Sequence, residues 1–196
     1  LLDNNIPVPQ FSETNFPVVG RPKKHHGGQG FFYCRDTQEV NSAKSQGATY
    51  FSKFYPKRSE YRVHIAGGRT LLFSVKNGRP EQLIWNRDIA GVKFRHMFRS
   101  EWLDDESLYE MQRVCKKAVK VLGLDFAAID VMADAGDDYP EFVISEVNTA
   151  PSLSPLALSK YVEYFKREID ERVVEVIPNQ KVNSYWNSFK SVFPSF

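Results

Sequence analysis

The sequence contains very little cysteine. Cys34 and Cys115 are its only two cysteines among 196 residues, and they stand far apart. A structural zinc site needs cysteines or histidines in closely spaced pairs, and a disulfide framework needs several cysteines. Neither arrangement occurs in this sequence. We therefore expect two reduced thiols in a cytoplasmic protein.

Long apolar runs and a strong charge of one sign are absent as well. No stretch approaches the roughly 18 apolar residues of a membrane-spanning helix. The opening residues LLDNNIPVPQ lack the basic region and apolar core of a secretion signal. The net charge of +2 gives no strong indication of nucleic-acid binding. A hydrophobic content of 42% is typical of an ordinary globular protein, for which we expect no membrane partner.

Hydrophobic periodicity predicts an α+β fold with mostly antiparallel hairpins. The pattern predicts strands around residues 18–19, 31–33, 48–54, 61–65, 71–75, 125–132 and 141–148, with EQLIW as a further candidate. It predicts helices near residues 37–46, 104–122 and 155–173. We expect a connector and small glycine-loop lobe over residues 1–56, a larger lobe over 57–175 and a tail over 176–196.

An acidic group falls on the last predicted hairpin. Asp130 lies in the middle of the apolar run FAAIDVM, and Glu146 and Asn148 lie two residues apart in EFVISEVN. Residues i and i+2 share one face of a strand, so Glu146 and Asn148 point the same way. Oxygen ligands from two adjacent strands favour a site for a hard cation such as Mg²⁺. The alternative is that both carboxylates pair with Arg or Lys.

A basic, glycine-rich loop follows the first predicted strand. Glycines let backbone N–H groups approach phosphate oxygens, while nearby cations supply charge. The loop carries Arg21, Lys23, Lys24, Gly27, Gly28 and Gly30. It does not have the spacing of a Walker A loop. A mobile surface loop is the alternative interpretation.

Glu60 and Arg62 share one face of the predicted strand that contains SEYRV. The carboxylate could accept hydrogen bonds from ribose hydroxyl groups, and the guanidinium could hold a phosphate. A cross-strand ion pair at the surface explains the same two residues without a ligand.

Three stretches, taken together, resemble the ATP-grasp superfamily of carboxylate–amine ligases. They are FPVVGRPKKHHGGQGF, SKFYPKRSEYRVHIAGG, and GLDFAAIDVM followed by EFVISEVNTAPSL. The match runs from about residue 6 to residue 169 and is most similar to the branch of ribosomal-protein glutamate ligases and to related phage-encoded proteins. The resemblance implies two α+β lobes with antiparallel sheets that enclose a nucleotide cleft.

The resemblance also implies roles for individual residues. Arg21 and Lys23 would contact the nucleotide phosphates, with the glycines of the loop closing over them. The segment of Lys53 and Phe54 would present its backbone to the adenine, and Glu60 would bind the ribose. Ser52 departs from the pattern, because many members have Glu there. The remaining implied residues are the phosphate and acyl-phosphate contacts Arg62, Asn86 and Arg87, and the Mg²⁺ ligands Asp130, Glu146 and Asn148.

The implied activity is an ATP- and Mg²⁺-dependent ligation of a carboxylate to an amine, on an amino acid or a peptide, through an acyl phosphate. One alternative is a nucleotide-binding or structural module of a larger assembly, without turnover. Another is a phosphotransferase on the same scaffold. Members usually carry a further N-terminal α/β domain, so we expect this domain to be missing from the chain or supplied by a partner chain.

Overall fold

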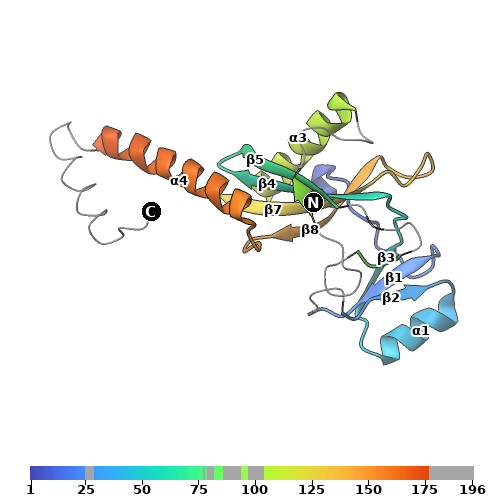
Figure 1. Cartoon of the computed structure of the whole chain (residues 1–196). Helices are drawn as coiled ribbons and strands as arrows, with labels where there is room; N and C mark the ends of the chain where they lie inside the picture. Colours follow the sequence, from blue (N-terminus) through green and yellow to red (C-terminus); the bar gives the residue numbers. More distant parts are fainter. Residues whose placement is uncertain (25–28, 77, 79–81, 86–93, 97–103, 177–196) are drawn as a thin grey trace. The chain divides into compact units, whose positions relative to one another are not determined.

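The described part of the chain forms two antiparallel sheets, each covered by a helix (Figure 1). The computed structural model describes residues 1–24, 29–76, 78, 82–85, 94–96 and 104–176. These residues divide into two compact units, Leu1–Ser152 and Leu153–Phe196, and both sheets belong to the first. The predicted α+β class with two antiparallel sheets is confirmed.

The small sheet has the strand order β2-β1-β3, with helix α1 packed on it. Val18 and Phe51 from the sheet and Val40 from the helix are all buried in its core. Asp36 caps the helix by accepting a hydrogen bond from the Glu39 N–H at 2.9 Å, which satisfies one of the otherwise unpaired donors of the first turn. The elements are β1 (Val18–Arg21), β2 (Phe32–Cys34), α1 (Thr37–Ser45) and β3 (Tyr50–Lys53).

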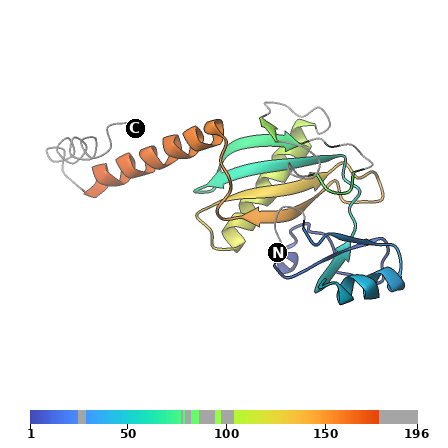
Figure 2. The same ribbon diagram turned by 60° about the horizontal axis from the view of Figure 1, so that its bottom comes forward.

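The large sheet has the order β6-β5-β4-β7-β8, and every neighbouring pair is antiparallel. Figure 2 shows helix α3 running behind this sheet, where Met111 and Cys115 are fully buried against strand residues such as Ile129. One face of the sheet therefore forms the core with α3, and polar residues occupy the other. The elements are β4 (Ser59–Ala66), β5 (Arg69–Lys76), β6 (Arg95–His96), α3 (Asp105–Val121), β7 (Phe126–Ala133) and β8 (Phe142–Asn148).

The ladder of the large sheet is interrupted twice by one extra residue. Between β4 and β5 the register shifts so that Leu71 has no partner, and between β7 and β8 it shifts at Ser145. An extra residue of this kind is a β-bulge, which changes the face to which the following side chains point. The two bulges therefore decide which residues share the polar face.

A short N-terminal segment, residues 6–12, joins one edge of each sheet and is called the strap below. Its Pro7 carbonyl accepts a hydrogen bond from the N–H of Ile144 in β8 at 2.8 Å. Its Gln10 carbonyl accepts one from the N–H of Lys53 in β3 at 2.7 Å. The strap thus covers two strand edges that would otherwise expose unpaired backbone groups.

The remaining described elements are η1 (Leu2–Asn4) and α4 (Pro155–Val176), the latter in the second compact unit. The further strand proposed for EQLIW is wrong over residues 82–85, where the chain is irregular. Among the described helices, none combines the length and the apolar character that a bilayer crossing requires. The predicted domain limits stay a prediction, although the chain passes from one sheet to the other between Lys53 and Ser59.

Replacement of Ile6 by alanine tests how firmly the strap is anchored. Ile6 is 1% exposed and belongs to the core of the large sheet. We expect Ile6→Ala to lower the free energy of unfolding by about 2–5 kcal/mol, because it leaves a cavity in a packed core. Urea denaturation measures the change. Leu2→Ala is the control, since Leu2 is 50% exposed, and equal effects of both substitutions would contradict the anchoring role.

Candidate functional site

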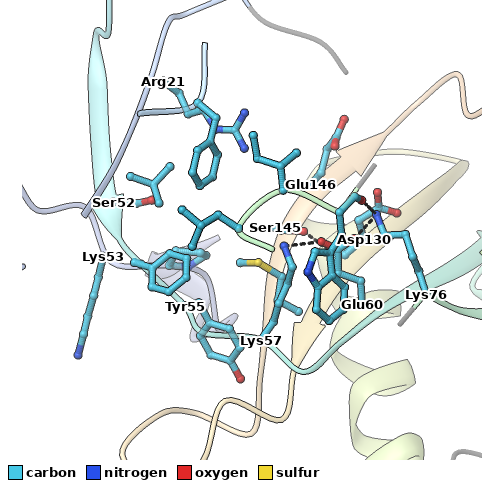
Figure 3. Close-up of a pocket in the computed structure, with 18 of the residues that line it drawn as sticks. Arg21, Ser52, Lys53, Tyr55, Lys57, Glu60, Lys76, Asp130, Ser145 and Glu146 are labelled. Atoms are coloured by element: carbon cyan, nitrogen blue, oxygen red, sulfur yellow. Dashed lines mark hydrogen bonds and ion pairs between the residues drawn. The ribbon is translucent and has the colours of Figure 1, made fainter. Parts of the chain in front are cut away.

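A cavity of about 1200 Å³ lies in the first compact unit and is lined by residues of both sheets (Figure 3). Ligand pockets typically measure about 300–1,000 Å³, so this one has room for a ligand larger than an amino acid. Its charged lining residues are Arg21, Lys23, Lys24, Lys53, Lys57, Glu60, Arg62, Lys76, Asp130 and Glu146. Seven of these ten residues carry a positive charge, which favours an anionic ligand.

One polar residue from each strand of the large sheet lies in a single row across its open face. Register pairs join His96 to Ser74, Ser74 to Arg62, Arg62 to Asp130, and Asp130 to Glu146. Paired residues in an antiparallel ladder point to the same face. Two pairs of neighbours in the row are in side-chain contact. Ser74 Oγ lies 3.1 Å from His96 Nδ1, and Arg62 binds Asp130.

Asp130 and Arg62 form a two-point ion pair at the centre of this row. Arg62 Nε donates to Asp130 Oδ1 at 2.6 Å and Nη2 donates to Oδ2 at 2.7 Å. The guanidinium also lies 4.4 Å from the centre of the Phe94 ring. Burial opposes the charge of Arg62, but its hydrogen bonds and attraction to Asp130 outweigh burial and raise its pKa. The ion-pair alternative from the sequence is thus realised for Asp130.

Glu60 is held by two lysines in the next row of the sheet. Its Oε1 lies 2.6 Å from Lys57 Nζ, and its Oε2 accepts from Lys76 Nζ, which also donates to the Trp85 carbonyl. Burial lowers the pKa of Lys57, and the charge of Glu60 counteracts this effect. Lys57 also lies 5.2 Å from the Trp85 ring centre. Both oxygens of the predicted ribose-binding carboxylate therefore already contact cations.

The bulge at Ser145 places Glu146 and Asn148 on the same polar face as Asp130. Ser145 Oγ donates to the Asp130 carbonyl at 3.0 Å, and Glu146 then stands opposite Asp130. Asn148 follows on the same face, opposite Ala128. Within the described part of the chain, the buried Nδ2 of Asn148 has no hydrogen-bond partner. Asp130 and Glu146 line the cavity, whereas Asn148 is absent from its described lining.

These residues fit a magnesium ion. Mg²⁺ usually takes one or two protein carboxylates and completes its shell with water and substrate phosphates. Asp130 and Glu146 supply two carboxylates opposite each other, and rotation of the Asn148 amide would present its oxygen in place of the unsatisfied Nδ2. No cluster of three His, Cys, Asp or Glu suited to a metal occurs among the described residues.

The small sheet contributes cations from its first strand and the following loop. Arg21 extends from β1 toward Glu146 (Figure 3), and its guanidinium lies 4.7 Å from the Phe31 ring centre. Burial lowers the pKa of Arg21, while the charges of Tyr50 and Glu146 oppose this shift. Gly30 has a φ of +63°, and an added Cβ would lie 2.6 Å from Pro22. Both observations require glycine at this end of the loop.

The backbone of the predicted adenine-binding segment is already engaged. The Lys53 N–H donates to the Gln10 carbonyl, and the Phe54 N–H donates to the Pro17 carbonyl at 2.9 Å. The Lys53 side chain places its ammonium 4.9 Å from the Tyr139 ring centre. An adenine base would therefore have to use other backbone groups of this segment.

Several predicted residues lie outside the described part of the chain, namely Gly27, Gly28, Asn86 and Arg87. The sequence reasoning also missed Lys57 and Lys76, which hold Glu60. Counting the hairpin from its Gly67-Gly68 turn without a bulge would place Val75, not Lys76, opposite Glu60. Nothing in the sequence pattern predicts that Leu71 is an extra, unpaired residue in β5.

No family model matches the sequence, and no curated protein matches it at a significant level. Solved structures do match the fold. The ATP-grasp ligase PsnB, complexed with a phosphomimetic variant of its minimal precursor, Mg and ADP, aligns over 82% of this chain and 54% of its own, with a TM-score of 0.55 and 13% identity. D-alanine–D-alanine ligase from Bacillus anthracis, complexed with ATP, aligns over 88% and 65%, with a TM-score of 0.62 and 18% identity.

The macrocyclase MdnC from Microcystis aeruginosa MRC, bound with the precursor peptide MdnA, gives a third match. It aligns over 84% of this chain and 56% of its own, with a TM-score of 0.54 and 12% identity. The chain has the ATP-grasp fold. It spans between 54% and 65% of the length of these three solved structures.

In this ATP-grasp fold the polar face of the large sheet also buries a histidine, His64, whose protonation is coupled to folding. His64 is 3% exposed, and burial, with the charges of Arg62 and His96, lowers its pKa from 6.5 to about 4. The unfolded chain binds a proton below pH 6.5, while the folded chain resists it until about pH 4. Stability contributed by the neutral imidazole is therefore present above pH 6.5 and is lost as the pH falls toward 4.

We expect the free energy of unfolding to fall by up to about 3 kcal/mol more in the wild type than in His64→Gln between pH 6.5 and pH 4, because about 1.4 kcal/mol accompanies each unit of pKa shift. Urea titrations at several pH values measure both curves. Carboxylates titrate in both proteins, so the difference between the two curves reports on His64 alone. Parallel curves would show that His64 is not held neutral by the fold.

Proposed function

We propose that the chain catalyses ATP- and Mg²⁺-dependent ligation of a carboxylate to an amine through an acyl phosphate. The observation that carries the proposal is the row in which Arg62, Asp130 and Glu146 line one wall of a cation-rich cavity, with Arg21 on the other. This arrangement joins carboxylates suited to a divalent ion with cations suited to phosphate. The ATP-grasp fold, shared with structures solved with ATP or with Mg and ADP, supports it.

The proposed nucleotide contacts are residues that line the cavity or follow its strands. Arg21 and Lys23, with Gly30 at the end of the loop, would bind phosphate oxygens from the side of the small sheet. The fork of an arginine matches a phosphate better than a single ammonium does. Asp130, Glu146 and Asn148 would hold the metal. Bound Mg²⁺ supplies neutralisation of the phosphate charge during transfer.

The proposed reaction has two steps. An oxygen of the acid substrate attacks the γ-phosphorus of ATP, which forms the acyl phosphate and releases ADP. The amine then attacks the acyl carbon, and the new amide forms as phosphate and a proton leave. Arg62 lies where it could bind the transferred phosphoryl group, and we propose the same task for Asn86 and Arg87. Exclusion of water from the cavity would protect both ATP and the acyl phosphate.

The finer identity of the substrates is also a proposal. We propose an amino acid or a peptide, since the solved structures with this fold include a ligase named for D-alanine and two proteins solved with precursor peptides. The similarity of the sequence to ribosomal-protein glutamate ligases and to phage-encoded proteins leads us to propose that branch, acting in the cytoplasm of a cell or of an infected host.

Substitution of the proposed metal ligands tests the site. We expect calorimetry to show binding of Mg-ATP to the wild type, and we expect ADP release with a pool of amino acids and peptides. Asp130→Asn and Glu146→Gln should each lower ADP release by roughly 100-fold or more, a loss typical of removing one electrostatic contact to a reacting group. Glu141→Gln is the matched control, because Glu141 is exposed just before β8. Full turnover in Asp130→Asn would refute the assignment.

Trapping with hydroxylamine tests the intermediate. An acyl phosphate reacts with this neutral amine to give a hydroxamate, which mass spectrometry detects. We expect hydroxamate only when Mg-ATP and the acid pool are both present. ADP release without hydroxamate would instead indicate phosphoryl transfer to a hydroxyl group. Binding of Mg-ATP without any ADP release would indicate a nucleotide-binding module.

A further inference from the structure

We propose that Arg62 acts as an internal counter-cation that occupies Asp130 until nucleotide phosphates arrive, so that a divalent ion is held firmly only together with the nucleotide. This inference rests on the proposed function and deepens it, because it assigns Arg62 control over the order of binding. It concerns a competition between two cations, the guanidinium and the metal ion, for one carboxylate.

The first support is the completeness of the ion pair. Both oxygens of Asp130 accept a hydrogen bond from Arg62, at 2.6 Å and 2.7 Å. The side chains are only 12% and 21% exposed, so water screens the pair weakly. A divalent ion that approached Asp130 alone would meet a fixed positive charge a few ångströms away. It would have to displace the guanidinium or bear its repulsion.

The second support is that a bound phosphate offers Arg62 an alternative hydrogen-bond acceptor to Asp130. A guanidinium has five N–H donors, and Asp130 takes two of them. Arg62 lines the cavity, so an oxygen of a bound polyphosphate can accept its remaining donors or replace Asp130 altogether. The same phosphate adds negative charge for the metal ion. The nucleotide therefore weakens the competitor and strengthens the site at once.

The third support is that the neighbouring carboxylate is neutralised in the same way. Glu60 binds Lys57 and Lys76, and all three side chains are at most 13% exposed. Leaving a buried carboxylate unpaired is costly, so the ligand-free protein gains by pairing each with its own cation. Phe94 lies over both Arg62 and Lys76, with ring-centre distances of 4.4 Å and 4.7 Å, and helps hold these cations in place.

Titration with Mn²⁺, a paramagnetic substitute for Mg²⁺, tests the competition without turnover. Electron paramagnetic resonance measures free Mn²⁺ for the wild type and for Arg62→Gln, with and without a non-hydrolysable ATP analogue. We expect Arg62→Gln to bind Mn²⁺ alone roughly tenfold tighter than the wild type, within the range usual for coupled sites. We also expect the analogue to tighten Mn²⁺ binding at least tenfold in the wild type and much less in the variant.

Arg113→Gln is the matched control. Arg113 makes the same two-point contact, through Nε and Nη2, with the exposed carboxylate of Glu110 on α3. Freeing that carboxylate should leave Mn²⁺ binding unchanged. The double variant Arg62→Gln, Asp130→Asn should lose the gained affinity, which assigns the ion to Asp130. Circular dichroism and the unfolding midpoint verify that each variant is folded.

Two results would overturn the inference. One is an Arg62→Gln protein that is folded and binds Mn²⁺ alone no better than the wild type. The other is a wild type that binds the analogue but holds Mn²⁺ no more tightly with it than without it. Failure of the proposed function looks different, since the wild type would then bind no ATP analogue or release no ADP from ATP, while the effect of Arg62→Gln on Mn²⁺ alone would still decide the competition at Asp130.

Discussion

The register of the large sheet is the constraint on which the site depends. In a regular strand Ile144 and Glu146 would share a face, and Ile144 belongs to the core. The extra residue Ser145 separates them, so that Ile144 faces Val131 in the core while Glu146 faces Asp130 in the cavity. The extra residue Leu71 does the same for β5, where it brings Lys76 opposite Glu60. Without these two bulges, Glu146 and Lys76 would turn toward the core, and the apolar neighbours Val147 and Val75 would take their places at the cavity.

The strand register brings charged side chains together in the cavity, and burial of these charges requires that each has a counter-ion nearby. Asp130 and Glu60 each lie beside at least one cation at hydrogen-bond distance, so neither carboxylate is a buried charge without a counter-ion. A phosphate ligand can then exchange partners with the carboxylates and need not bring a new charge into an apolar site. The same residues thus stabilise the ligand-free fold and stand ready to bind an anion together with a metal. The cavity that these residues share favours a functional role for them.

Much of the fold was predictable from the sequence, because most strands and helices carry a clear apolar period. The hairpin of β7 and β8, the helix of α3 and the placement of Asp130 in the middle of a strand all follow from that period. The acidic and basic candidates were found from residue type, from their spacing along the predicted strands and from the family resemblance. The register of β4 with β5 could not be predicted, since a bulge leaves no compositional mark, and Lys76 was therefore not foreseen opposite Glu60. The ion-pair alternative for Asp130 named no partner, because β4 and β7 lie far apart in the sequence and only the fold pairs Arg62 with Asp130. The engaged N–H groups of Lys53 and Phe54 were missed for a related reason, because their acceptors lie far away in the sequence.

Those acceptors explain a further property of the cleft. The strap reaches from the Pro7 carbonyl at the edge of β8 to the Gln10 carbonyl at the edge of β3, and three residues of extended chain span at most about 11 Å. At this end the two sheets therefore cannot separate far without breaking backbone hydrogen bonds. Because Pro9 of the strap also lines the cavity, the same segment that limits the separation of the sheets forms part of the wall that a ligand would contact.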